Sequence, residues 1–237
     1  EEKFTMKLKK IASLMLAGIM AVSMLTACGD GSKAPVDDGT ETPDVDVSTS
    51  ASADTFVAAL SNDARNNVTA VANADLDAAL EDAVEVYFND WVAADYGHFF
   101  GVPGFTNGRD FGDVRKDRIG KAVAKAMGYA EDRIQDIDPS EENGTVKKVA
   151  VETYAVNGSV SDQAILENLA AKMDESIRNL DADYVNKGKD PYNYTDSLTE
   201  CDYEVSTSIV TATGKYMGVD VTVKFVSVAV ERIDTAV

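Results

Sequence analysis

Few residues in this chain are of the types that do chemistry in catalytic or metal sites. There is one histidine, His98, and there are two cysteines, Cys28 and Cys201. A histidine can act as a general base near neutral pH, and a cysteine thiolate is a strong nucleophile. A zinc site needs several such ligands, so we expect no metal and no cofactor. We expect instead that His98 is structural or exposed and that Cys201 is an inert, partly buried thiol, with a catalytic pair as the alternative.

Aromatic residues concentrate around His98: eight of them lie between residues 87 and 111, in a segment that is also rich in glycine. Rings on such a loop can form a pocket that stacks on a sugar or on the apolar face of a ligand. In the alternative interpretation, the rings are the main core of the domain. The predicted ligand-binding residues are Tyr96, His98, Phe99, Phe100, Phe105 and Arg109.

Cys28 ends the tetrapeptide Leu25-Thr26-Ala27-Cys28, which follows an apolar run from Ile11 and several lysines before it. This order of features resembles the lipobox signal peptide of bacterial lipoprotein precursors. The resemblance implies transfer of diacylglycerol to the Cys28 thiol, cleavage before Cys28 and acylation of the new amino terminus. A retained transmembrane helix is the alternative, but Ile11–Ala27, at 17 residues, is near the lower limit for crossing a bilayer.

The lipobox divides the chain into three expected parts. Residues 1–27 are the segment before Met6 and a cleaved signal peptide, and residues 28–53 are the lipidated cysteine and a disordered acidic linker. Residues 54–237 are a single globular domain. Gly29 and Asp30 after the cysteine resemble lipoproteins of monoderm bacteria. This resemblance implies that the lipid anchor holds the chain at the outer face of the plasma membrane.

A second resemblance concerns the segment Ser197–Cys201, Ser-Leu-Thr-Glu-Cys. It is similar to the Thr-Leu-x-Thr-Cys nucleophile segment of class B-type sortases, which are thiol transpeptidases. The resemblance implies that Cys201 is a nucleophile assisted by the upstream His98. This chain departs from the pattern at Glu200, whose carboxylate would raise the pKa of a neighbouring thiol.

The composition restricts the partners. The formal net charge is −19, which repels nucleic acid phosphates, so we expect no nucleic acid partner.

With Cys28 committed to lipid, Cys201 has no intramolecular partner for a disulfide. The core alone must therefore stabilise the domain.

Periodicity and capping residues predict four helices. The first begins at Asp54 and runs to about Val71. The others are capped by Asn73, by Asp113 and by Ser159 or Ser161. Gly128 is expected to end the third helix, and the apolar stripe of the fourth, Ile165 to Leu180, is expected to pack on a sheet.

The same patterns predict three strands. The first covers Val146 to Val156, and a C-terminal hairpin joins Tyr203–Thr213 to Tyr216–Ile233 through a turn at Gly214-Lys215. Late in the last strand the apolar residues change parity, which indicates a bulge or burial on both sides. The predicted fold is α+β, with N-terminal helices followed by β-α-β-β and a small, mostly antiparallel sheet.

These observations favour a surface-exposed, non-enzymatic lipoprotein that binds a small molecule, a glycan or an envelope protein. The alternative is a cell-envelope enzyme, a sortase-like transpeptidase or a hydrolase, that uses Cys201 and His98. A third class is a structural subunit of an assembly.

Overall fold

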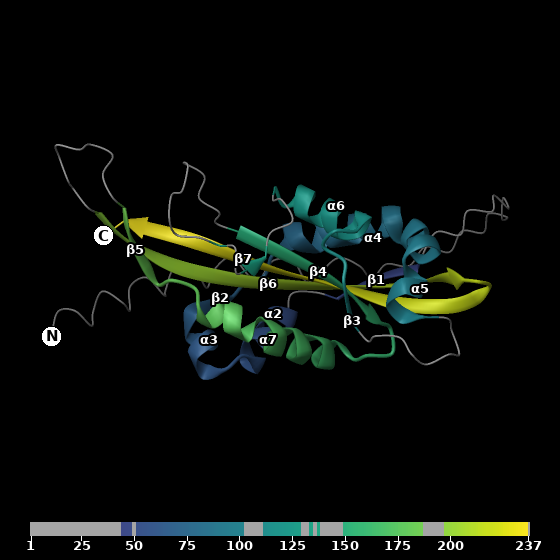
Figure 1. Ribbon diagram of the computed structural model, residues 1–237, viewed down its shortest axis with the longest axis horizontal. Helices are drawn as coiled ribbons and strands as arrows, with labels where there is room; N and C mark the ends of the chain where they lie inside the picture. Colours follow the sequence, from purple (N-terminus) through teal and green to yellow (C-terminus); the bar gives the residue numbers. More distant parts are fainter. Residues whose placement is uncertain are drawn as a thin grey trace, which may run out of the picture. The chain divides into compact units, whose positions relative to one another are not determined.

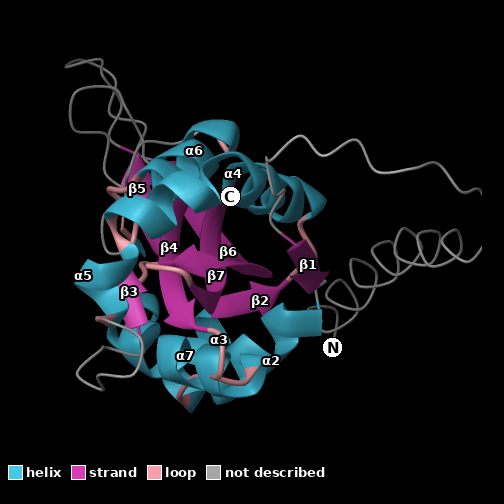
Figure 2. Cartoon of the chain, turned by 90° about the vertical axis from the view of Figure 1, so that its right-hand side faces the viewer, coloured by secondary structure: helices cyan, strands magenta, loops and turns pink. Residues whose placement is uncertain are grey.

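A computed structural model of the chain describes residues 44–48, 51–101, 111–128, 133–134, 137, 149–186 and 197–236. All of these residues belong to one compact unit. They form a mixed α/β structure in which a seven-stranded sheet lies between two layers of helices (Figures 1 and 2). The expected signal peptide and Cys28 lie outside the described residues.

Within the described residues, the elements follow one another in a mixed order. They are β1 (Asp44–Ser48), α2 (Ala51–Ala59), α3 (Asn62–Asn67), β2 (Val68–Ala70), α4 (Ala74–Ala94), α5 (Tyr96–Phe100), β3 (Phe111–Asp113), α6 (Arg118–Ala126), β4 (Val149–Asn157), α7 (Asp162–Arg178), β5 (Asp183–Asn186), β6 (Ser197–Tyr216) and β7 (Val219–Ala236). The predicted mixture of helices with a mostly antiparallel sheet is confirmed. The short strands β1, β2, β3 and β5 were not predicted.

The sheet is organised around the long β6–β7 hairpin. Its main path is β1-β6-β7-β4-β3, and β2 and β5 also pair with β6. Along its outer edge, from its first residue to its last, β6 therefore pairs in turn with three short strands, β5, β2 and β1. Only the β2–β6 pair is parallel among the described strands. Because β1 pairs with β6, the expected linker, residues 28–53, is not disordered over 44–48, and α2 already begins at Ala51.

The hairpin is longer than predicted and turns at a different place. Its two-residue turn is Met217-Gly218, with φ of 52° and 80°, rather than Gly214-Lys215. Positive φ at both positions is the conformation that matches the twist of paired strands. The register runs unbroken from Thr199–Ala236 to Tyr216–Val219, so there is no bulge. Of the two alternatives for the last strand, burial on both sides is confirmed.

Each face of the sheet packs against its own layer of helices. Even-numbered β7 residues such as Val226 and Val228 join the core under α2, α3 and α7, which confirms the predicted packing of the α7 stripe on the sheet. Odd-numbered residues such as Val223 and Phe225 join the core under α4, α5 and α6. Figure 2 shows these two helix layers above and below the strands.

The caps explain where the helices begin and end. Asn73 and Ser161 cap α4 and α7 as predicted, each accepting a hydrogen bond from a backbone N–H three residues later. Gly128, with φ of 78°, follows the last turn of α6 as predicted. Asp113 does not cap α6: it lies in β3, and the residue before α6 is Asp117.

The helix expected from Asp54 to Val71 is instead divided into α2 and α3. Ser61 separates them, because its side chain caps α3 and its N–H and hydroxyl both donate to the Asp174 carboxylate of α7. Residues 68–70 then form β2 alongside β6. Contacts from distant segments therefore override the local helical pattern.

Candidate functional site

A polar cavity of about 220 Å³ lies between β3, β4 and α7. It is lined mostly by charged and hydroxyl-bearing side chains, although the core beside it is apolar. The lining residues are Asp113, Arg115, Arg133, Glu152, Tyr154, Lys172, Met173 and Ser176.

Strand β4 supplies the floor of this cavity. Glu152 and Tyr154 are two residues apart, so their side chains lie on the same face of the strand, the one toward α7. The Tyr154 hydroxyl donates a short hydrogen bond to Glu152 Oε2, and the backbone N–H of Ile134 donates to Oε1 at 3.2 Å. Burial, together with the neighbouring Glu152, raises the pKa of Tyr154 far above its usual value. The hydroxyl therefore stays protonated and remains a donor.

The end of β3 adds an ion pair at the cavity edge. Asp113 lies opposite Tyr154 in the β3–β4 ladder. Arg115, 94% buried, donates to the Asp113 carboxylate from Nε at 3.0 Å and from Nη2 at 2.7 Å. Burial acts against ionisation of Asp113, but these bonds and the Arg115 charge hold its pKa below the usual value. Both groups are therefore charged at neutral pH.

Helix α7 contributes another cationic side chain, Lys172, to the cavity lining. The Lys172 ammonium lies 4.3 Å from the centroid of the Tyr154 ring, within the range of a cation–π contact. Together with Arg115 and Arg133, three cationic side chains line the cavity against two carboxylates. Asp113 and Glu152 already accept hydrogen bonds from protein donors. The lining therefore has one more cationic than acidic side chain, in a chain whose net charge is −19.

This arrangement is suited to holding a small anion. Arginine and lysine bind carboxylate and phosphate oxygens, and the Ser176 hydroxyl can add a hydrogen bond, whereas the Tyr154 hydroxyl already donates to Glu152. A cavity of about 220 Å³ is smaller than most drug-sized pockets, so it restricts the ligand to a few heavy atoms. Among the described residues, no group of three or more His, Cys, Asp or Glu side chains could hold a metal ion.

The aromatic segment that we predicted as a ligand site is partly core. Tyr96 and Phe100 are buried in α5, a short helix rather than a loop. Trp91 lies at the centre of the cluster, with its ring centroid 5.7 Å from the stacked Phe99 and 5.1 Å from Phe225. The packing of these rings agrees with the alternative interpretation, in which they belong to the core of the domain. His98 is exposed on α5, and Phe105 and Arg109 lie outside the described residues.

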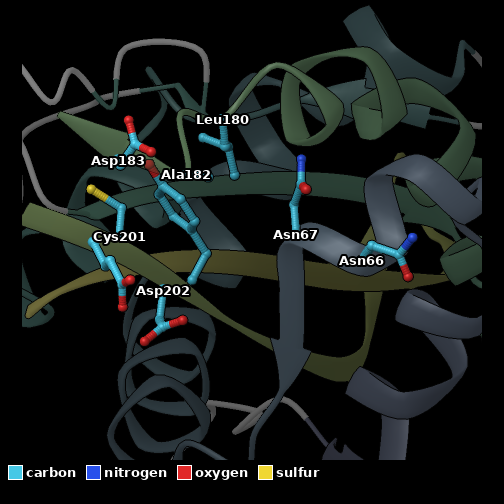
Figure 3. Close-up of a pocket in the computed structure, with 9 residues that line it drawn as sticks. Asn66, Asn67, Leu180, Ala182, Asp183, Cys201 and Asp202 are labelled. Carbon is cyan, nitrogen blue, oxygen red and sulfur yellow. The ribbon is translucent and has the colours of Figure 1, made fainter. Parts of the chain in front are cut away.

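Cys201 lines a different cavity, of about 330 Å³, at the start of β6 (Figure 3). Its thiol is free and buried, and Sγ lies 3.8 Å from Asp234 Oδ1. Burial raises the pKa of Cys201, and the neighbouring Asp234 adds to this shift, while Arg232 acts against it. Asp183 and Asp202 also line this cavity, so its charged surroundings disfavour a thiolate.

The structure does not bring Cys201 and His98 together. Cys201 lies near the beginning of β6, whereas Tyr216 at its end packs against Tyr96 of α5, the helix that carries His98. Fifteen residues of strand separate Cys201 from Tyr216, a path of about 50 Å at 3.3 Å per residue. Figure 1 shows α5 and β5 at opposite ends of the sheet. A thiol–imidazole pair cannot form across this distance.

Sequence reasoning missed the β4 cavity. One signal was available: Glu152 interrupts the apolar strand sequence Val-Ala-Val-Glu-Thr-Tyr-Ala-Val, and a carboxylate in a buried strand needs partners. Its neighbours Arg115 and Lys172 are far away in the sequence, and only the tertiary fold brings them to it.

Comparisons with protein-family models, curated proteins and solved structures give no match to this chain. Among the described residues, no helix has the length and apolar character needed to span a bilayer.

Proposed function

We propose that this protein is a lipid-anchored binding protein at the outer face of the plasma membrane that holds a small anion in the β4 cavity. The anchor rests on the lipobox-like segment ending at Cys28. The ligand class rests on one observation: Arg115, Arg133 and Lys172 line a small polar cavity whose two carboxylates already accept hydrogen bonds within the protein.

Recognition would combine charge and shape. The Lys172 side chain is exposed and its ammonium lies over the Tyr154 ring, so it can move to meet an anion. Arg115 is fixed by Asp113 and supplies a preorganised positive charge. Such a site favours a short carboxylate or a phosphate over a sugar, because an anion gains a charge–charge interaction with Lys172 that a neutral ligand lacks.

The test is isothermal titration of the mature chain with acetate, glutamate and inorganic phosphate at low ionic strength. We expect at least one of these anions to bind, and Lys172→Gln to weaken that binding about tenfold, the effect of losing one charge-assisted hydrogen bond at an exposed position. Lys125→Gln, on α6 at the opposite face of the sheet, makes the same change in net charge and serves as the matched control.

Two results would contradict the anion site: the absence of binding for every anion in the panel, or equal losses in Lys172→Gln and Lys125→Gln. The anchor is tested separately. Cys28→Ala is expected to move the chain from the membrane fraction to the soluble fraction, and its retention in the membrane would argue against lipidation.

A further inference from the structure

The tip of the β6–β7 hairpin exposes apolar side chains that do not pack in either core of the described fold. Met217 in the turn is 74% exposed and Val219, the first residue of β7, is 48% exposed. Met217 also has a left-handed backbone, with φ of 52°, a conformation that turns of this kind usually assign to Asn, Asp or Gly. Neither burial nor backbone preference explains a methionine here, which suggests that its side chain meets something outside the domain.

The residues beside the turn pack against α5, and the hairpin charges nearest to it cancel. The Tyr216 ring lies 4.9 Å from that of Tyr96, so the hairpin end is fastened to α5. The nearest charged residues of the hairpin, Lys215 and Asp220, have opposite signs and are paired directly across the ladder. In a chain with a net charge of −19, this end of the hairpin can therefore approach headgroups that repel the rest of the surface.

The first residue of β1 is its end nearer this tip. Strand β1 pairs antiparallel with β6, with Asp44 opposite Thr213 and Ser48 opposite Ile209, so Asp44 is closer than Ser48 to the turn. Figure 1 shows β1 in the same half of the sheet as the hairpin end and α5, with the C-terminus at the other end. The 15 residues between Cys28 and Asp44 can span at most about 50 Å when fully extended.

We propose that the hairpin tip is a membrane contact, in which the side chains of Met217 and Val219 enter the boundary between lipid headgroups and acyl chains. This inference rests on the proposed lipid anchor at Cys28. The anchor supplies most of the affinity and a high local concentration of bilayer, so two apolar side chains suffice to orient the domain. The tip would then face the membrane, and the opposite end of the sheet would face outward.

The test uses the full lipidated chain bound to vesicles of phosphatidylcholine and phosphatidylglycerol in a 3:1 ratio, with and without bromine on the phosphatidylcholine acyl chains. Met217→Trp places an indole at the tip, and Val86→Trp places one at a 67% exposed position on α4 as the matched control. The native Trp91 is buried and gives a constant background. We expect brominated lipid to quench the introduced fluorescence of Met217→Trp at least twofold and that of Val86→Trp by less than a tenth.

Vesicle flotation separates the two proposals. Equal quenching of both variants in a chain that floats with the vesicles would overturn the tip contact and leave the anchor standing. A lipid-processed chain that does not float, or a Cys28→Ala chain that floats equally well, would overturn the anchor and with it the inference about the tip.

Discussion

At the scale of single residues, a row of buried hydroxyls crosses the face of the sheet under α4. Ser208, Ser227 and Thr153 are neighbours across three strands, and Thr153 Oγ1 lies 2.9 Å from Ser227 Oγ. Asp77, in the first turn of α4, lies beside Ser208, yet Asp77 Oδ1 and Ser208 Oγ have no hydrogen-bond partner among the described residues. Burial therefore raises the pKa of Asp77, against a smaller opposing effect of the Ser208 hydroxyl.

This shift predicts how the stability depends on pH. A carboxyl group whose pKa is higher in the folded state holds its proton more tightly there, so its contribution is most favourable below its unfolded pKa of about 3.8 and is lost as pH rises through the folded pKa. The free energy of unfolding of Asp77→Asn, relative to the native chain, should thus increase between pH 3 and pH 7.

Urea unfolding at a series of pH values measures this difference. Asp75→Asn, which removes an exposed carboxylate from the same helical turn, corrects for the lost interaction with the helix dipole. If the stability of Asp77→Asn relative to the native chain were constant, or fell with pH, Asp77 would not be destabilised by burial.

At the scale of secondary-structure elements, the approach of α6 to the end of β3 fixes the position of Arg115. Gly120, in the first turn of α6, packs directly on the backbone at Val114 and Arg115. A Cβ atom at Gly120 would lie 2.7 Å from Arg115 Cα and closer still to the Val114 carbonyl oxygen. Because the obstacle is backbone, it cannot move aside as a flexible side chain would.

We therefore expect Gly120→Ala to lower the free energy of unfolding by about 2–3 kcal/mol, the usual effect of overpacking. It should also weaken anion binding in the chains that remain folded, since relief of the clash shifts the backbone of Arg115 relative to α6. Gly128→Ala is the control: no atom lies within 4 Å of its added Cβ, so only the left-handed backbone, with φ of 78°, opposes it, at about 1 kcal/mol. Equal losses in denaturant unfolding would show that the contact with β3 is unimportant.

The elements also show which features local sequence can predict. Helices α4 and α7 have long apolar stripes and side-chain caps at Asn73 and Ser161, so their positions follow from nearby residues alone. Strands β2, β3 and β5 have only three or four residues each, too few for a periodic pattern, and they exist because β6 or β4 offers an edge. The true turn escaped prediction because Met217-Gly218 lacks the usual turn residue at its first position.

The site was harder to predict than the fold, because it also depends on contacts between segments that are distant in the sequence. Cys201 and His98 attracted attention because their residue types are chemically active, but one is buried among carboxylates and the other is exposed on α5. The cavity instead uses Arg115, Glu152 and Lys172, which are common residue types that become a site only through the pairing of β3 with β4 and the packing of α7. Charge balance inside a cavity is a tertiary property.

At the scale of the whole described fold, the β6–β7 hairpin separates the candidate sites along its length. The cavity of Cys201 lies near one end of β6, and the exposed tip and α5 lie at the other, with the proposed anion site on the α7 side between strands β3 and β4. Residues at opposite ends of such a hairpin cannot share a reaction, whatever their chemical types.

This separation predicts the reactivity of Cys201. In the mature chain with Cys28→Ala, so that Cys201 is the one thiol, iodoacetamide at pH 7.5 should alkylate the folded protein at least tenfold more slowly than the same chain unfolded in urea. Burial of the thiol limits access, and the raised pKa of Cys201 lowers the thiolate fraction. His98→Ala should leave the folded rate unchanged within a factor of two, because about 50 Å of strand lies between the two groups. Rapid alkylation that depends on His98 would require the two groups to meet, and would favour the thiol transpeptidase alternative over the non-enzymatic interpretation.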